Sequence, residues 1–251
     1  MKLTENTILV TGGGTGIGRG LAEALHRRGN TVIIAGRRLD VLEGVAAANP
    51  GMKAVELDIA DPTSIAGAAK RVLAEHPDLN VLINNAGVML ADDVAAPLDE
   101  DVVAAEVTTN LLGSIRTTSV FIDHLKRQHS ATVVYNTSTL AFTPLAPFAF
   151  YSATKAALHS YALSQRFALR DTSVRVQEIV PPWVATGLVG PEGDPRAMPT
   201  KAFIDEALKG LATDAEEIVV EQARVYRNNA GPNEHAYVDE LNTFMTTQLQ
   251  A

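Results

Sequence analysis

Two side chains with complementary acid–base chemistry stand four residues apart in the stretch FYSATKAALHSYAL, residues 150–163. Its mostly small or apolar residues predict a helix, on which Tyr151 and Lys155 would lie one above the other. A lysine held beside a tyrosine hydroxyl favours the phenolate and lowers the pKa of the phenol. The pair could therefore donate or accept a proton near neutral pH. The alternative is a solvated lysine beside a surface tyrosine.

A serine and an asparagine could complete such a site. Ser138 closes the strand expected over 131–136, at the carboxyl edge where open α/β sheets bind ligands. It could hydrogen-bond a substrate carbonyl, or only its own backbone. Asn110 falls inside the helix expected near 99–127, where asparagine is unfavourable unless its side chain bonds elsewhere. It could be a satisfied helix residue, or a relay that anchors water near Lys155.

A glycine-rich turn, TGGGTGIG at residues 11–18, lies between the first expected strand and the first expected helix. Glycines at 12, 16 and 18 allow a tight turn, close approach of backbone N–H groups to a pyrophosphate, and close packing of helix on strand. The diphosphate would lie at the positive N-terminal end of the helix. The alternative is an ordinary tight loop, but the position after a strand favours dinucleotide binding.

Two arginines follow the second expected strand, where a dinucleotide fold contacts the adenosine ribose. An acidic residue there would bind the ribose hydroxyls and repel a 2′-phosphate, but the sequence has Arg37 and Arg38. Guanidinium groups suit phosphate, so NADP(H) is predicted in preference to NAD(H). Arg38 better fits a solvated charge that opens a helix, so Arg37 is the predicted phosphate contact.

Two further strand ends carry polar residues. Asp58 could accept a hydrogen bond from the adenine amino group or cap the next helix, although Asp61, before Pro62, fits the cap better. In NNAG (84–87) the asparagines could bond loop backbone groups and Gly87 could permit close approach to a ribose. The alternative is an ordinary Asn-Gly turn.

Short β-branched runs alternate with longer helical patterns along the chain. Strands are expected over 7–11, 31–35, 53–57, 80–84, 131–136 and 174–180, and helices near 16–28, 38–48, 62–76, 99–127 and 151–170. This alternation predicts an α/β fold: one Rossmann-type, doubly wound parallel sheet with helices on both faces. A Pro- and Gly-rich loop follows residue 181, and helices are expected near 200–211, 214–229 and 235–248. We expect a single domain over residues 1–251, with a small helical substrate region over about 183–251.

The composition narrows the function classes. A net charge of −8 argues against nucleic-acid and anionic-membrane partners, which select basic surfaces. The absence of cysteine excludes disulfides, thiolate nucleophiles and sulfur-ligated metals, and no metal site is predicted. The four-residue apolar run near the N-terminus is too short for a signal peptide, and no stretch approaches a membrane span. We expect a soluble, cytoplasmic protein.

Taken together, these residues resemble the short-chain dehydrogenase/reductase family, over roughly residues 5–190 and with the motifs in order. The resemblance implies a catalytic tetrad of Asn110, Ser138, Tyr151 and Lys155. By this resemblance, Tyr151 would be the general acid in reduction and the base in oxidation, and Lys155 would lower the pKa of the Tyr151 phenol and bond the nicotinamide ribose. Ser138 would orient the substrate carbonyl, and Asn110 would hold a water of the proton relay. It also implies cofactor contacts at Gly12, Thr15, Gly16, Ile17, Gly18, Arg37, Arg38, Asp58, Ile59, Asn85, Ala86, Gly87, Tyr151, Lys155, Pro181, Val184 and Thr186.

Two segments depart from the family pattern. In IVPPWVATGL (179–188) Pro182 replaces the usual glycine and Trp183 follows, while Thr186 still falls where the family bonds the nicotinamide carboxamide. Together with EIVVEQARVYRN (217–228), this segment resembles the DltE-like subgroup of oxidoreductases. The family's glycine-rich final strand is missing, and a helix is expected in its place. A homodimer through the helices near 99–127 and 150–170 therefore fits as well as a homotetramer.

The expected activity is NADPH-dependent carbonyl reduction or the reverse alcohol oxidation. The substrate is expected to be an apolar ketone or aldehyde, aromatic or of medium chain length, because the loops at the carboxyl edge are apolar. The expected contacts are Leu140, Phe142, Leu145, Phe148, Trp183, Leu188 and Val189. Arg196 could close over an anion instead. The alternatives are a catalytically silent dinucleotide-binding regulatory member, which would not need the tetrad, and a nucleotide-sugar epimerase, which usually needs a longer chain.

Overall fold

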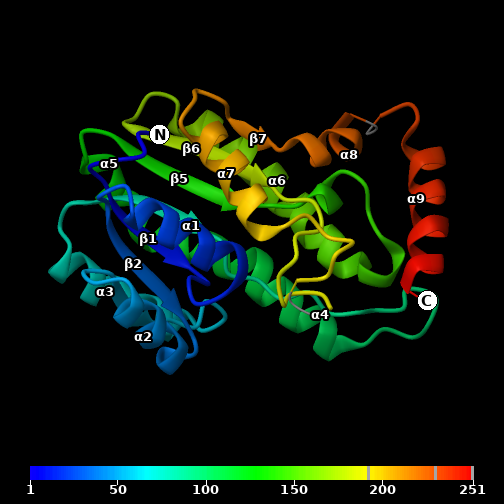
Figure 1. The fold of residues 1–251 in the computed structure, drawn as a ribbon, viewed down its shortest axis with the longest axis horizontal. Coiled ribbons are helices and arrows are strands. Elements are labelled where there is room, and N and C mark those ends of the chain that lie inside the picture. Colours follow the sequence, from blue (N-terminus) through cyan, green and yellow to red (C-terminus); the bar gives the residue numbers. More distant parts are fainter. Residues whose placement is uncertain (191–192, 229–230, 250–251) are drawn as a thin grey trace.

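A seven-stranded parallel sheet, in the order β3-β2-β1-β4-β5-β6-β7, forms the centre of the computed structural model, which describes residues 1–190, 193–228 and 231–249 (Figure 1). The strands are β1 (Thr7–Thr11), β2 (Thr31–Gly36), β3 (Lys53–Glu56), β4 (Leu79–Asn84), β5 (Ala131–Asn136), β6 (Val174–Val180) and β7 (Glu217–Val219). From β1 the chain adds β2 and β3 on one side and β4 onward on the other, which is the doubly wound order predicted. Ligands of such sheets bind at the carboxyl ends of the strands beside this reversal.

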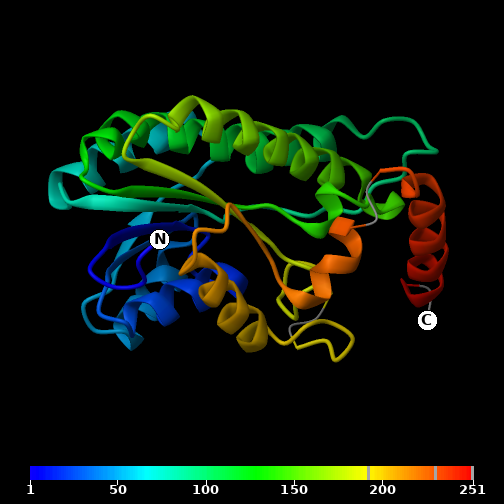
Figure 2. The same ribbon diagram turned by 90° about the horizontal axis from the view of Figure 1, so that it is seen from above.

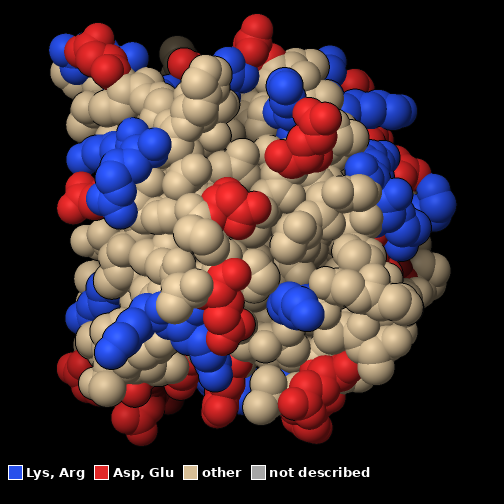
Figure 3. Space-filling model, turned by 90° about the vertical axis from the view of Figure 1, so that its left-hand side faces the viewer, with Lys and Arg blue, Asp and Glu red and all other residues tan. Residues whose placement is uncertain are grey.

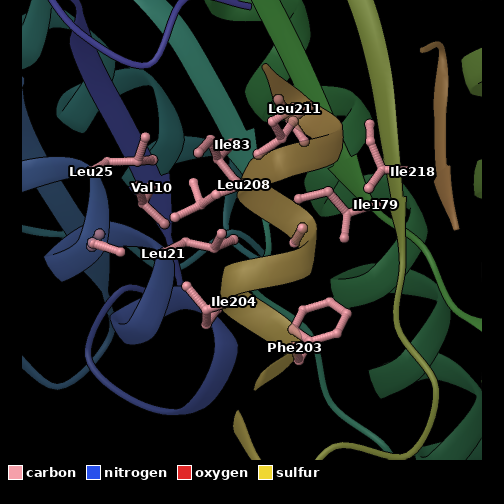
Figure 4. Close-up of a cluster of buried hydrophobic side chains, with 14 of the residues drawn as sticks. Val10, Leu21, Leu25, Ile83, Ile179, Phe203, Ile204, Leu208, Leu211 and Ile218 are labelled. Atoms are coloured by element: carbon pink, nitrogen blue, oxygen red, sulfur yellow. The ribbon is translucent and has the colours of Figure 1, made fainter. Parts of the chain in front are cut away.

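Helices cover both faces of the sheet, which Figure 2 shows nearly edge-on. One face packs against α1 (Gly16–His26), α2 (Leu39–Ala48) and α7 (Thr200–Leu211), and the other against α3 (Pro62–Glu75), α5 (Ser114–Arg127) and α6 (Ala149–Leu169). The strands are apolar because both of their faces are buried. On the first face, Figure 4 shows α7 directing its apolar side chains toward the sheet and α1, among them Phe203, Ile204, Leu208 and Leu211.

The helix expected near 99–127 is continuous but changes its winding. It consists of α4 (Glu100–Glu106), a π-helix (Val107–Gly113) and α5. The wider π-turn contains Asn110, and such turns occur frequently at functional sites. Gly113 is needed there, because a Cβ at this position would lie 2.7 Å from the carbonyl oxygen of Ile59.

The prediction of a helix near 214–229 was wrong for the first half of this segment. The chain instead adds β7 to the edge of the sheet, parallel to β6, and continues through a 3₁₀ turn (Glu221–Ala223) into α8 (Arg224–Asn228); residue 229 lies outside the described residues. A short segment such as Glu217–Val219 carries too little periodicity to separate strand from helix, and pairing with β6 decides the outcome. The last helix, α9 (Glu234–Leu249), forms as predicted and stands at one end of the molecule (Figure 1).

The surface carries charges of both signs. Figure 3 shows basic and acidic side chains interspersed on the face at the left of Figure 1, without a field of one sign. Within the ranges that the structure describes, none of the helices has the length and apolar character needed to cross a membrane.

Candidate active site

A cavity of about 760 Å³ opens at the carboxyl edge of the sheet. Its walls come from the glycine-rich turn after β1, the ends of β2 to β6, the start of α6, the loop after β6, and the C-terminal helices. Three of the four predicted tetrad residues, Ser138, Tyr151 and Lys155, line it directly. Residues far apart in the sequence therefore meet where a doubly wound sheet binds its ligand.

Tyr151 and Lys155 lie together on α6, and both are almost completely buried. The Lys155 Nζ lies 5.5 Å from the centre of the Tyr151 ring and donates a 2.8 Å hydrogen bond to the carbonyl oxygen of Asn136 at the end of β5. Burial lowers the pKa of Lys155 to about 8, while the Glu106 carboxyl raises it. The ammonium is therefore held by the backbone of the sheet and is easier to deprotonate than a surface lysine.

The Tyr151 phenol has a different electrostatic setting from the one expected. Burial raises the pKa of Tyr151, a hydrogen bond with the Ser138 side chain lowers it, and the Glu106 carboxyl raises it again. Burial is the largest of these effects, so the pKa of the phenol is raised, whereas Lys155 alone was expected to lower it. A buried phenolate loses its hydration, and this cost exceeds the stabilisation from Ser138. The phenol is therefore protonated at neutral pH.

Ser138 makes the backbone contact considered for it, and its contact with a substrate carbonyl stays a prediction. Besides its hydrogen bond with Tyr151, its Oγ accepts a 3.1 Å hydrogen bond from the backbone N–H of Leu140, as a strand-end residue does. This second bond fixes the side chain in the cavity wall.

Asn110 lies behind the cavity wall, within the π-helix. Its side-chain amide both accepts from the Val88 N–H and donates to the Val88 carbonyl oxygen, each at 2.8 Å, and it also donates to Thr154 Oγ1 at 3.4 Å. The amide oxygen and the amide nitrogen of Asn110 therefore both have hydrogen-bond partners within the protein. The relay role that the resemblance implies stays a prediction.

The glycine-rich turn lines the cavity and packs tightly against the chain behind it. A Cβ at Gly12 would lie 2.8 Å from Asn85 Nδ2, and one at Gly18 would lie 2.3 Å from the carbonyl oxygen of Gly12, so neither position accepts a side chain. Thr15, the N-cap of α1, makes no side-chain hydrogen bond to the first turn. The N–H groups at this helix end are therefore available to an anion, and the turn fits the phosphates of a dinucleotide.

The predicted adenosine-side residues gather at the other end of the cavity. Both Arg37 and Arg38 are exposed and line it, and within the described ranges neither guanidinium makes an ion pair. Asp58 also lines the cavity and accepts a 2.9 Å hydrogen bond from the Ala60 N–H. Asp61 caps α3 through the Thr63 N–H, as predicted. Of all the predicted cofactor contacts, only Gly18 does not line the cavity, because it lies beneath the turn.

Asn85 bonds backbone groups, as considered for the asparagines of NNAG, and it also contacts a neighbouring strand end. Its Nδ2 donates to the carbonyl oxygen of Thr11 at 3.0 Å, and its Oδ1 accepts from Asn136 Nδ2 at 2.8 Å. Asn85 therefore ties the ends of β1, β4 and β5 together under the cavity. The neighbouring Thr11 Oγ1 accepts from the Asn85 and Ala86 N–H groups, which strengthens the same junction.

The predicted substrate residues are almost all in the wall. Leu140, Leu145, Phe148, Trp183, Leu188 and Val189 line the cavity. Phe142 is the exception, because it does not line the cavity, and the prediction that it would contact the substrate was wrong. Its ring packs edge-on against His159 at 4.8 Å and under the Arg227 guanidinium at 4.5 Å, below the site. Arg196, the candidate anion contact, pairs with Asp194 at 2.8 Å and lies over the Trp183 ring.

Sequence reasoning missed several wall residues that come from remote segments: Val88, Met89, Leu90, Tyr226, Leu241 and Met245. Met89 and Met245 pack against a cluster formed by Leu145, Phe148 and Tyr151. The helical pattern of α9 was visible in the sequence, but no local signal indicated that it would reach the phenol. The Asn242 side chain makes this contact possible by donating to the Pro144 carbonyl oxygen at 3.0 Å and accepting from the Ala146 N–H.

Comparisons with known proteins agree with this geometry. Residues 6–197 match the family model described as short chain dehydrogenase. The "Uncharacterized oxidoreductase DltE" of Bacillus subtilis is 37% identical over 249 residues, which cover 97% of this chain and 99% of that protein. A short chain dehydrogenase from Burkholderia cenocepacia, solved in complex with NADP, is 28% identical, covers 96% of this chain and 99% of its own, and superposes with a TM-score of 0.85.

A second solved structure shares the fold alone. It is a short chain dehydrogenase/reductase from Burkholderia phymatum in complex with NAD, 20% identical, with a TM-score of 0.79 over 92% of this chain and 98% of its own. The family model and the Bacillus relative together span nearly the whole sequence. The chain belongs to the short-chain dehydrogenase family of oxidoreductases, and the likeness to a DltE oxidoreductase agrees with the subgroup that the sequence resembled.

Proposed function

We propose that this chain is an NADPH-dependent carbonyl reductase, which also catalyses the reverse alcohol oxidation. The observation that carries the proposal is the arrangement of Ser138, Tyr151 and Lys155, three buried polar side chains around one apolar cavity. Within that cavity a small carbonyl compound could contact the Ser138 and Tyr151 hydroxyls at the same time. A protein that only stored dinucleotide would have no use for these buried groups, whose burial is costly.

The dinucleotide would supply the hydride, held with its phosphates at the glycine-rich turn and its nicotinamide near Thr186. Ser138 would then hold the substrate oxygen by a hydrogen bond, and Tyr151 would donate its proton to that oxygen as the hydride arrives at carbon. The Lys155 ammonium would stabilise the phenolate left behind, because opposite charges at this separation attract strongly in a buried site. The raised pKa of Tyr151 suits this direction, since the phenol is fully protonated at neutral pH.

The preference for NADPH rests on Arg37 and Arg38. Both guanidinium groups lie at the end of β2, where a dinucleotide's 2′-phosphate would lie, and the described residues place no carboxylate against them. The NADP complex of the Burkholderia cenocepacia relative supports the choice. The fold itself takes either cofactor, because the more distant neighbour carries NAD.

The substrate class follows from the cavity wall. Leucine, methionine and aromatic side chains surround Tyr151, so an aryl or medium-chain ketone or aldehyde would fit. An anionic substrate would need a cation in the wall. Arg196 lies near Trp183, but its guanidinium is paired with Asp194.

The proposal is tested by following NADPH absorbance with an aryl ketone, a 2-oxo acid and a keto-sugar. We expect the highest kcat/KM for the aryl ketone, and a loss of kcat in Tyr151→Phe of about 10²–10⁴-fold with NADPH affinity unchanged. A higher kcat/KM for the 2-oxo acid or the keto-sugar would contradict the substrate class. Binding of NADPH without turnover of any carbonyl would favour a silent dinucleotide-binding protein.

A further inference from the structure

Glu106 is a buried carboxyl beside the cavity with no part in the mechanism above. It ends α4 one helical turn before Asn110, and its side chain is completely buried. Its Oε1 accepts a 2.8 Å hydrogen bond from the backbone N–H of Leu90, while its Oε2 has no hydrogen-bond partner among the described residues. Burying an ionisable side chain with one unpaired oxygen costs folding free energy, so we expect a function that requires it.

The carboxyl acts on a segment that forms part of the cavity wall. Residues 88–92, the wall segment from here on, lie after β4, and its residues Val88, Met89 and Leu90 line the cavity. Asn110 holds Val88 by two hydrogen bonds, and Glu106 holds Leu90 by one. Glu106 and Asn110 are four positions apart along one helix, and the residues that they hold, Leu90 and Val88, are two positions apart in the wall segment. One helix face can therefore hold alternate residues of the wall segment.

The far end of the wall segment is tied to the helix that carries Tyr151. The Asp92 N–H donates to the Pro147 carbonyl oxygen at 3.0 Å, and Asp92 Oδ2 accepts from the Phe150 N–H at 2.9 Å. Between the anchored residues, Met89 packs against the cluster that Leu145, Phe148 and Tyr151 form. The wall segment thus connects the Asn110 helix to the start of α6, and it carries one of the residues that cover this cluster.

We propose that Glu106 is a positioning residue for carbonyl reduction, acting through the Leu90 N–H to fix the wall segment and with it Met89 against the cluster of Leu145, Phe148 and Tyr151. The inference rests on the proposed function for its kinetic part only. A side chain with an acceptor oxygen is required at this position, whereas an apolar one would leave the partly buried Leu90 N–H without this acceptor. Electrostatic contacts agree with this location, since the carboxyl interacts with Asp92, Lys155 and Tyr151.

The test compares Glu106→Gln, which keeps an acceptor oxygen, with Glu106→Leu, which removes it. Glu100→Leu is the matched control, because Glu100 is exposed in the first turn of the same helix. The readouts are amide hydrogen exchange in peptides covering the wall segment, the dissociation constant of NADPH, and KM and kcat for an aryl ketone.

In Glu106→Leu we expect faster exchange in the wall segment and a KM for the ketone raised about five- to tenfold, as for loss of one partly buried hydrogen bond. NADPH affinity should stay within about twofold, and Glu106→Gln and Glu100→Leu should behave like the wild type. Unchanged exchange and KM in Glu106→Leu would overturn the proposal, and so would a Gln variant as impaired as the Leu variant. An equal loss of NADPH affinity would indicate a general structural role instead, and would also overturn it.

The failure of this inference is distinguishable from failure of the proposed function. If the wild type reduces no carbonyl, the proposed activity is wrong, but hydrogen exchange still decides whether Glu106 fixes the wall segment. If the wild type turns over and the wall segment exchanges equally in all variants, only the role of Glu106 is wrong.

Discussion

The Lys155 ammonium lies 5.5 Å from the centre of the Tyr151 ring, yet its 2.8 Å hydrogen bond goes to the Asn136 carbonyl rather than to the phenol. The two groups are neighbours on α6 but are held by different partners, Lys155 by the end of β5 and Tyr151 by Ser138. Their pKa values are moved in opposite directions by the same burial, down for the lysine and up for the tyrosine. This relationship sets the pH dependence of the proposed reaction.

Reduction should be fastest below about pH 8 and should decline above it. The pKa of Lys155 is lowered to about 8, so the ammonium that stabilises the developing phenolate is present below that pH and is lost as the pH rises through it. Oxidation needs the phenolate, and the raised pKa of Tyr151 places this form well into the alkaline range. We therefore expect kcat/KM for alcohol oxidation to rise without a plateau through neutral pH.

Steady-state rates in both directions across the pH range check this expectation. The ultraviolet phenolate absorbance of the wild type minus that of Tyr151→Phe gives the ionisation of this one tyrosine without any turnover. A Tyr151 phenolate already formed near neutral pH would contradict this expectation, because it would show that Lys155, and not burial, determines the pKa of the phenol.

The order of the sheet and most of the candidate site were predictable, because they depend on local patterns. β-branched runs identified six strands, and the glycine-rich turn, the Tyr151–Lys155 spacing and Ser138 all lie at strand or helix ends that the sequence marks. Asp61 is a comparable case, since its capping of α3 follows from its place before Pro62. These features depend on neighbours within a few residues.

Other features depend on packing between distant segments and left no local signal. The raised pKa of Tyr151 results from its burial in a cluster with Leu145 and Phe148, against which Met89 and Met245 pack from distant parts of the sequence. Phe142 was expected in the cavity because it is apolar, but its ring packs against His159 and Arg227 instead. The strand β7 was missed because its three residues gain their conformation from pairing with β6.

The two arginines after β2 should differ in their effect on cofactor choice. Arg37→Ala should raise the KM for NADPH by about 10- to 150-fold, the equivalent of losing a charge-assisted hydrogen bond worth about 1.5–3 kcal/mol, and should scarcely affect NADH. Arg38→Ala is the matched control, because Arg38 is also exposed at the cavity and begins α2 as its N-cap. A larger loss of NADPH affinity in Arg38→Ala would reverse the assignment, and equal wild-type kcat/KM values for NADPH and NADH would remove its basis.

Gly18 should not tolerate alanine, although it lies in a helix, where alanine is usually the better residue. A Cβ there would lie 2.3 Å from the Gly12 carbonyl oxygen, so the glycine-rich turn would have to move. We expect Gly18→Ala to lose about 1–3 kcal/mol of folding free energy and most of its NADPH affinity. In Gly44→Ala the new Cβ would meet no atom within 4 Å, and this exposed position in α2 should gain up to about 1 kcal/mol. Thermal unfolding and NADPH titration of both variants give the comparison, and a fully stable, NADPH-binding Gly18→Ala would show that the turn adapts.

The contact between α9 and the loop before α6 should control substrate binding without affecting the cofactor. Asn242 makes two polar contacts between them, to the Pro144 carbonyl oxygen and the Ala146 N–H, and Leu241 and Met245 on the same helix line the cavity. In Asn242→Ala both hydrogen bonds are lost, which weakens the attachment of α9 to the loop.

Met245 should then leave the cluster around Tyr151, and the KM for a bulky aryl ketone should rise about three- to tenfold, as for the loss of one or two hydrogen bonds. NADPH affinity should be unchanged, because the predicted cofactor contacts lie on other elements. Thr243→Ala is the control, since this neighbouring side chain is exposed. Met245→Ala should enlarge the cavity next to the phenol and shift preference toward larger ketones. If neither Asn242→Ala nor Met245→Ala changes the ranking of ketones by size, α9 covers the cavity without contacting the substrate, and specificity lies with Leu145, Phe148 and Trp183 instead.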